Sequence, residues 1–334
     1  MISNFLFKRP IVVVFDVTKR CNSKCNMCSL WKRPSKVSDE LTIKQVEKIF
    51  TDLKSFGIKQ VFIQGGEPFL RDDLFEIISL IDSIGLKPCL ITNGLLLTKF
   101  NALALSKLNC NVTVSLDTLK PLCYKKIRGI DAFNVVKKNL LFASKLPRKG
   151  YWSINSTISE LNADELVSLY DFAIVNGFSF TVFPYNYSVC KASAKDESLV
   201  FKNKNAVLVS FRKLSVKARE RKDFFVKLIA DETIKYLSGG YTKPCDALRY
   251  SIMIDECGRI APCIELSSEF DLRKNSIRDI WPKLDKARVR NCYLSTPCFY
   301  GCTRGVSAVM CNLFNVVKFS ILNPKKSISL LRLL

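Results

Sequence analysis

The stretch IVVVFDVTKRCNSKCNMC, residues 11–28, joins an apolar run to a loop that carries three cysteines. The run at 11–16 has the continuous apolar character of a parallel strand that helices cover. The loop then places Cys21, Cys25 and Cys28 at C-x3-C-x2-C spacing. Soft thiolates select zinc, copper(I) or iron–sulfur clusters. A zinc knuckle needs a fourth ligand, so three thiols favour a [4Fe-4S] cluster whose fourth iron binds a small molecule.

Five more strand-length runs follow this stretch, and amphipathic segments of helical length separate them. The runs are 60–64, 89–92, 111–117, 152–159 and 179–184, and the helical segments include 43–56, 74–84 and 162–176. Thr42 and Gln45 form a capping-box pattern, and Gly57 ends the helix that it opens. Six successive βα units predict an α/β fold, a partial (β/α)6 TIM-like barrel with its ligands at the carboxyl ends of the strands.

The composition narrows the chemistry. The chain has 334 residues, 14 cysteines, no histidine and a net charge of +22. Cysteines without a secretory signal favour metal or redox chemistry over disulfides, and no apolar run is long enough for a membrane span, so a cytoplasmic protein is expected. Acid–base steps must use carboxylate, Lys, Tyr or Cys, since histidine is absent. The positive charge favours an anionic partner, or serves solubility alone.

The pattern changes along the chain and predicts four regions. Residues 1–194 form the barrel. The strand pattern is lost over 195–240, where ten Lys/Arg stand against four Asp/Glu up to position 227, which predicts a linker of solvated helices. Residues 241–305 hold six of the 14 cysteines and form a small cysteine-rich domain. The tail at 306–334 is basic, apolar and free of acidic residues.

On these cysteines and three further motifs, the chain resembles the radical S-adenosylmethionine (radical SAM) enzymes. GGEP follows the second strand, TNG closes the third and VSLD closes the fourth, which is the family's order. The resemblance implies a SAM-binding [4Fe-4S] cluster on the three loop cysteines. It assigns contacts with SAM to Met27, Gly65, Gly66, Glu67, Pro68, Thr92, Asn93, Ser115, Asp117 and Asn155. Gly65 and Gly66 would let the backbone approach the ligand, and Glu67 would accept from an ammonium group. Strand alternation would point Ser115 and Asp117 together into the barrel mouth.

The later cysteines resemble the SPASM/twitch extension that follows many of these barrels. Cys245 and Cys263 match its opening hairpin, and CYLSTPCFYGC matches its later part. Val289 stands where the form with two auxiliary clusters has a cysteine. One auxiliary [4Fe-4S] cluster is therefore expected, although four thiolates also suit zinc. The ligands implied are Cys245, Cys263, Cys298 and Cys302, with Cys292 as the substitute for one of them.

The resemblance implies reductive cleavage of SAM to a 5′-deoxyadenosyl radical, which abstracts hydrogen from a substrate. The electron would come from an external donor of the flavodoxin or ferredoxin type. A peptide is the first expectation for the substrate, and a lipid, sugar or other small metabolite is the alternative. The tail at 306–334 suits contact with an anionic membrane surface, or docks on the barrel as a helix. The alternative of another class is a non-catalytic metal-knuckle protein that binds nucleic acid, but the aromatic residues do not alternate with the basic ones as a stacking platform requires.

Overall fold

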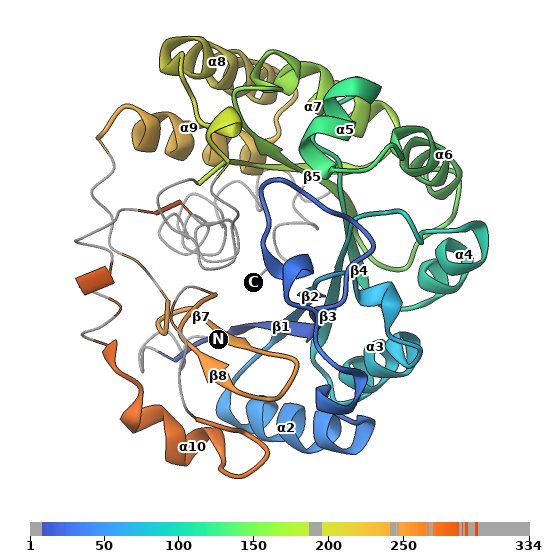
Figure 1. The fold of residues 1–334 in the computed structure, drawn as a ribbon, viewed down its shortest axis with the longest axis vertical. Coiled ribbons are helices and arrows are strands. Elements are labelled where there is room, and N and C mark those ends of the chain that lie inside the picture. The colour runs from blue at the N-terminus through green and yellow to red at the C-terminus, as the bar shows by residue number, and fades with distance from the viewer. Residues whose placement is uncertain are drawn as a thin grey trace.

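The computed structural model describes residues 9–186, 196–240, 245, 247–264, 266, 270–286, 289, 291–292 and 298–299. One curved sheet of eight strands runs through these residues, in the order β6-β5-β4-β3-β2-β1-β7-β8 (Figure 1). The strands are β1 Val12–Thr18, β2 Gln60–Gly65, β3 Lys87–Thr92, β4 Asn111–Ser115, β5 Trp152–Ile158, β6 Ser179–Pro184, β7 Ser251–Ile254 and β8 Ile260–Ala261. All six predicted strands are present, and each pairs in parallel with the next along the chain. The predicted α/β class and TIM-like curvature are confirmed.

Helices cover the outer side of this sheet, as Figure 1 shows. They are α2 Ile43–Phe56, α3 Leu74–Ser83, α4 Lys99–Lys107, α5 Pro121–Arg128, α6 Phe133–Ala143, α7 Leu166–Val175, α8 Lys204–Glu220, α9 Phe224–Leu237 and the short α10 Ile277–Ile280. No helix among the described residues is long and apolar enough to cross a membrane.

Helix α2 shows how the sequence sets these elements. The predicted capping box is present, because the Thr42 side chain accepts from the Gln45 main chain and Gln45 accepts in return. The apolar stripe of the helix is buried, and Phe50 packs against Phe15 of β1 with ring centroids 5.1 Å apart. Gly57 ends the helix with φ at 121°, a conformation that suits only glycine. Local capping and one apolar face therefore fix both ends and the packed side of α2.

Helices α8 and α9 lie in the region for which solvated helices are predicted. That prediction is wrong for their inner faces, since Phe211, Leu214 and Ile229 are buried in the main core. The charged residues that suggested full solvation occupy the outer faces. An abundance of charge along a helix does not exclude a buried stripe, because the two occupy different faces.

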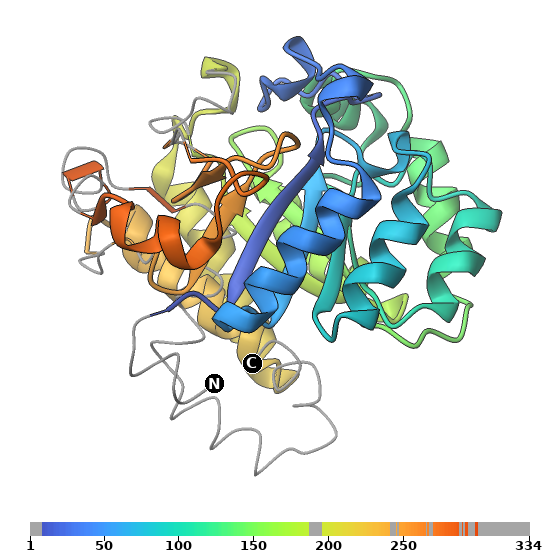
Figure 2. The same ribbon diagram turned by 90° about the horizontal axis from the view of Figure 1, so that it is seen from below.

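The chain then returns to the opposite edge of the barrel. Strand β7 pairs in parallel with β1, so that Val12 lies opposite Ser251, and β8 turns back antiparallel to β7. The hairpin turn contains Gly258 with φ at 83°. Strand β7 thus lies beside β1, the strand that leads into the cysteine loop, although the two are about 240 positions apart in the sequence. Figure 2 shows β1 rising, in dark blue, to that end of the molecule.

Candidate active site

The loop with the three cysteines follows the carboxyl end of β1, as predicted. Cys25 is buried, and Cys21 and Cys28 are half-buried. Main-chain bonds hold the loop to the end of α5, because Lys24 N donates to the Arg128 oxygen at 3.2 Å. Asn26 makes two similar bonds to α5, through its main-chain and side-chain nitrogens. The loop is therefore anchored along a helix end rather than projecting freely.

The three thiols of this loop suit a cluster better than a single zinc ion. A structural zinc ion takes four protein ligands, whereas a [4Fe-4S] cluster can be held by three cysteines, each on a different iron. Among the residues that the structure describes, Asp255, Glu256 and Cys257 bring three possible ligand atoms within 4.8 Å of one another. Burial raises the pKa of Cys21 to about 11 and also raises that of Cys28, so cluster binding must release protons.

A buried arginine that sequence reasoning missed lies beside these thiols. Arg128 Nη1 is 3.8 Å from the Cys25 sulfur, and Nη2 is 2.6 Å from Asp117 Oδ2. The Arg128 Nε–H is buried and has no hydrogen-bond partner. A buried cation with an unpaired donor suits an anionic group of thiolates and sulfides. The donor set and this orphan N–H therefore fit a cluster held by Cys21, Cys25 and Cys28.

Asp117, which was predicted to face the barrel mouth together with Ser115, makes its contacts within the protein. Its side chain is fully buried, pairs with Arg128 and accepts from Thr157 N at 2.8 Å. Strand β4 ends at Ser115, so the alternation on which the prediction rested no longer applies at position 117. Burial raises the pKa of Asp117, and the neighbouring guanidinium opposes that shift. Asp117 holds Arg128 in place in this structure.

The two glycines after β2 make a close approach, but to the chain's own backbone. A Cβ on Gly65 would lie 2.1 Å from the Thr18 oxygen, and one on Gly66 would lie 2.1 Å from the Arg20 oxygen. Gly66 N and Glu67 N donate to those same two oxygens, each at 2.8 Å. The glycines were expected to let the backbone approach a ligand. In this structure they also let the turn pack against the main chain at the start of the cysteine loop. Pro68 follows as the first residue of a short 3-10 turn.

Glu67 is fully buried, and its hydrogen bonds run within the protein. Its oxygens accept from Thr92 Oγ1 and Asn93 N, each at 2.8 Å, and from Phe69 N at 3.3 Å. Burial raises its pKa to about 7, against the effect of these bonds. Asn93 in turn donates to Asn22 in the cysteine loop at 2.8 Å. The GGEP and TNG motifs are therefore hydrogen-bonded to each other and to the cysteine loop, so the three segments lie together at one end of the barrel.

Polar side chains line the inner face of the sheet near its carboxyl end. Ser115 lies opposite Asn155 in the β4–β5 register, and Asn155 accepts from Thr181 Oγ1 at 2.9 Å. On the other side, Asp16 accepts from Gln64 Nε2 at 3.1 Å. Burial raises the pKa of Asp16 to about 7, with Glu256 adding to the shift. Ser115 and Asn155 thus occupy the predicted end of the barrel.

Met27, the predicted apolar neighbour of the adenine, packs against a small cluster that contains Ile127, Tyr185 and Leu199. Trp31 closes the loop by donating its Nε1–H to the Cys25 oxygen at 3.1 Å. An apolar wall therefore lies on the α5 side of the cysteine loop.

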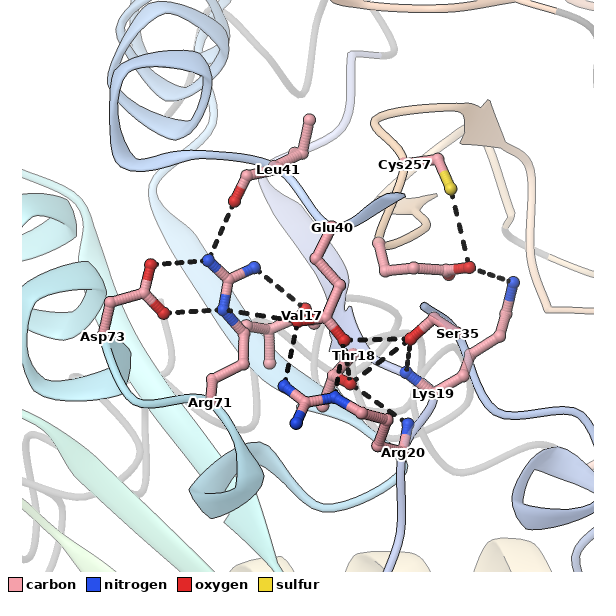
Figure 3. A network of polar contacts seen from close by, with 11 residues as sticks. Val17, Thr18, Lys19, Arg20, Ser35, Glu40, Leu41, Arg71, Asp73 and Cys257 are labelled. Atoms are coloured by element: carbon pink, nitrogen blue, oxygen red, sulfur yellow. Dashed lines mark hydrogen bonds and ion pairs between the residues drawn. The ribbon is translucent and has the colours of Figure 1, made fainter. Parts of the chain in front are cut away.

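Figure 3 shows a polar network around the buried carboxylate of Glu40. This network includes Thr18 and Arg20, at the start of the cysteine loop. Glu40 accepts from Nε and Nη2 of Arg20, each at 3.1 Å, and from the hydroxyls of Thr18 and Ser35. Although burial opposes the effect, these bonds hold the pKa of Glu40 below its usual value. Arg71 lies 4.0 Å from Glu40 and donates to main-chain oxygens of β1 and of the segment before α2. The network fixes the backbone from which the cysteines extend.

The later cysteines are described only in part. Cys245, Cys263 and Cys292 are half-buried and pack against the main core, and Cys298 is half-buried as well. Cys302 and the tail at 306–334 lie outside the described residues. Cys257 donates its thiol hydrogen to Glu256 Oε1, which also accepts from Lys19 Nζ at 2.7 Å. The auxiliary cluster and its ligand set stay predictions.

Comparison with known proteins agrees with this geometry. Residues 15–173 match the family model of the radical SAM superfamily. Similar curated proteins include two named "Probable GTP 3′,8-cyclase". The one from Methanococcus maripaludis is 36% identical over 153 residues, which is 44% of this chain and 52% of that protein. The one from Thermococcus kodakarensis is 32% identical over 176 residues, 51% of this chain and 56% of that protein. The chain spans about half the length of these relatives.

Two solved structures share the fold over most of the chain. Streptococcus suis SuiB bound to S-adenosylmethionine superposes with a TM-score of 0.68 at 20% identity, over 89% of this chain and 68% of SuiB. The protein anSMEcpe with bound AdoMet and a peptide superposes with a TM-score of 0.63 at 16% identity, over 88% of this chain and 85% of that one.

Proposed function

We propose that the protein is an enzyme of the radical SAM superfamily, whose family model residues 15–173 match, and that it cleaves S-adenosylmethionine reductively. A [4Fe-4S] cluster bound by Cys21, Cys25 and Cys28 would supply one electron to the S–C5′ bond of SAM. Methionine and a 5′-deoxyadenosyl radical would result, and the radical would take a hydrogen atom from the substrate to give 5′-deoxyadenosine and a substrate radical. An external flavodoxin- or ferredoxin-type protein would supply the electron.

The observation that carries this proposal is the anchored three-thiol loop beside a buried cation. Arg128 donates toward Cys25 and stands on α5, to which the loop is bonded. Gly66 and Glu67 hold the other side of the loop through main-chain bonds. The residues of this chain thus fix the orientation of three cluster ligands, while Ser115 and Asn155 offer hydrogen-bonding groups at the neighbouring strand ends.

Anaerobic reconstitution tests the proposal. The wild-type chain, supplied with iron, sulfide, SAM and dithionite, should show the EPR signal of a reduced [4Fe-4S] cluster and release 5′-deoxyadenosine. Cys28→Ala should lose both signals, whereas Cys123→Ala, at a half-buried cysteine in α5, should keep them. Equal release of 5′-deoxyadenosine by Cys28→Ala and the wild type would contradict the assignment.

For the substrate, we propose a peptide. SuiB, which shares the fold, has also been solved with its precursor peptide SuiA, and anSMEcpe has been solved with a peptide. A nucleotide is the second candidate, because the curated relatives with 32–36% identity are named as probable GTP 3′,8-cyclases. A panel of peptides and GTP, assayed for a substrate-dependent rise in 5′-deoxyadenosine and for a product of altered mass, separates the two. Conversion of GTP with no peptide converted would overturn the peptide proposal.

The proposed auxiliary cluster has a separate test. Two clusters predict iron and sulfide for two cubanes per chain, and the Cys263→Ala variant should lose about half of both. Iron for one cubane together with one zinc per chain would instead favour a zinc site in the cysteine-rich segment.

A further inference from the structure

The surface beside the cysteine loop has an unusual charge distribution. Residues 17–38 contain six Lys/Arg and no acidic residue. Lys19 and Arg20 are ion-paired with Glu256 and Glu40. The remaining four cations, Lys24, Lys32, Arg33 and Lys36, are exposed.

Helix α5 adds further cations beside the part of this loop that contains Lys24. Lys125 and Lys126 are exposed near its carboxyl end, where the helix is bonded to the cysteine loop. Asn26 donates to the Lys126 main-chain oxygen at 2.9 Å, so the loop and this end of α5 lie side by side. Lys125 has an exposed partner, Asp131, at 3.5 Å, a contact that contributes little in water. We call Lys24, Lys32, Arg33, Lys36, Lys125 and Lys126 the basic face.

Two exposed apolar side chains belong to the segments that carry this face. Val37, next to Lys36, is 66% exposed, and Leu122, at the start of α5, is 79% exposed. Small apolar contacts within a charged surface are typical of transient complexes, in which charge steers the encounter and the contact area stays small. Single exposed apolar residues are common on protein surfaces, but here they accompany six exposed cations, alongside the exposed acids Asp39 and Asp131.

We propose that the basic face is the docking surface for an acidic redox protein of the flavodoxin or ferredoxin class. The inference rests on the proposed function, because that function requires one electron from a protein donor. Lys24 lies between Cys21 and Cys25 in sequence, so a partner that covers the basic face comes close to the cluster ligands. The reduced partner gives one electron to the cluster and leaves in its oxidised form. An anionic membrane would match the same charge, and the test includes it as a contrary outcome.

The experiment compares two charge-reversal pairs. Lys36→Glu/Lys126→Glu changes the basic face, and Lys138→Glu/Lys145→Glu changes two exposed lysines on and after α6 by the same charge. The probe is a purified flavodoxin of net negative charge, and its Kd for the cluster-loaded chain is measured at several salt concentrations. The first pair should weaken binding by about 10- to 100-fold and lower its salt dependence, and the control pair should change it by less than about 3-fold. Equal effects of the two pairs, or no effect of either, would overturn the proposal.

Two rates then separate this inference from the proposed function. The release of 5′-deoxyadenosine is measured once with reduced flavodoxin at low concentration and once with dithionite. The ratio of the flavodoxin-driven to the dithionite-driven rate should fall with the basic-face pair and stay constant with the control pair. If the wild type releases no 5′-deoxyadenosine with dithionite, the proposed function is refuted. The Kd values of the two pairs for flavodoxin would still test the docking surface. If the basic-face pair weakens binding to anionic phosphatidylglycerol vesicles but leaves the Kd for flavodoxin unaltered, the basic face is a membrane contact and the proposal is refuted.

Discussion

Replacing Arg128 by methionine tests how the cysteine loop is held. The guanidinium is buried between Asp117 Oδ2 at 2.6 Å and the Cys25 sulfur at 3.8 Å. Methionine keeps much of the side-chain volume but removes the charge, which leaves the fully buried Asp117 carboxylate without its cation. Breaking a buried ion pair from one side costs about 3–5 kcal/mol, because the remaining charge is desolvated and uncompensated. We therefore expect the free energy of unfolding of the cluster-free chain to fall by that amount.

Urea unfolding of the cluster-free chain at pH 7 measures this change for Arg128→Met, Asp117→Asn and the double variant. The double variant should recover part of the loss, because Asn in place of Asp117 removes the unpaired charge, with a coupling energy of about 1–3 kcal/mol. Arg148→Met serves as a control, since that half-buried guanidinium lies over the rings of Trp152 and Phe178. A loss below about 1 kcal/mol for Arg128→Met, or strictly additive losses in the double variant, would refute the reasoning. After reconstitution, the cluster of Arg128→Met should also have a more negative midpoint potential, because a nearby cation favours the reduced state.

Three further changes address other parts of the site. Gly66→Ala should abolish cluster uptake, because its Cβ would lie 2.1 Å from the Arg20 oxygen, whereas Gly240→Ala, with 3.7 Å to its nearest neighbour, should retain normal iron content. Thr92→Val should lower the free energy of unfolding by about 1.5–3 kcal/mol through the lost bond to the Glu67 carboxylate; Thr113→Val, which loses a neutral bond to Ser153, should cost less in the same urea titration. The folded chain binds a proton at Asp16 up to about pH 7, while the unfolded chain releases it near pH 3.8, so stability should fall as pH rises between these values, by at most about 4 kcal/mol. Asp16→Asn should flatten the dependence of the free energy of unfolding on pH in this range. An unchanged dependence would contradict the raised pKa of Asp16.

The strands and their helices could be predicted because their signals are local. Buried parallel strands read as short apolar runs, and Thr42 and Gly57 mark the ends of α2 through capping and φ preferences. The position of the cysteine loop followed from the end of the first run. The proximity of the GGEP and TNG turns to that loop could also be predicted, because parallel strands place their carboxyl ends at one edge of the sheet.

The partners within the site could not be predicted in the same way. Arg128 is one of several basic residues near the end of α5, and nothing in its neighbours distinguishes the buried cation from the exposed Lys125 and Lys126. The ion pair of Asp117 could not be predicted from strand alternation, because the strand ends at Ser115. The pairing of β7 with β1 joins segments far apart in the sequence, so it could not be predicted from local patterns; β7 adds to the edge that β1 presents in the folded barrel.

The way in which the cysteine loop is supported also bears on the alternative of a metal-knuckle protein. Small metal knuckles fold only when the metal gathers their ligands, so that the binding free energy is spent on ordering the chain. Here the loop is ordered from both sides by groups that are not ligands. Gly66 N and Glu67 N bind the main chain at its start, and the end of α5 binds Lys24 N and Asn26 N. These anchors belong to a barrel with an extensive apolar core of its own, so little binding free energy is needed to order the loop. A site prepared in this way can leave one iron without a protein ligand and still retain its cluster, which is the condition that binding and cleavage of SAM require.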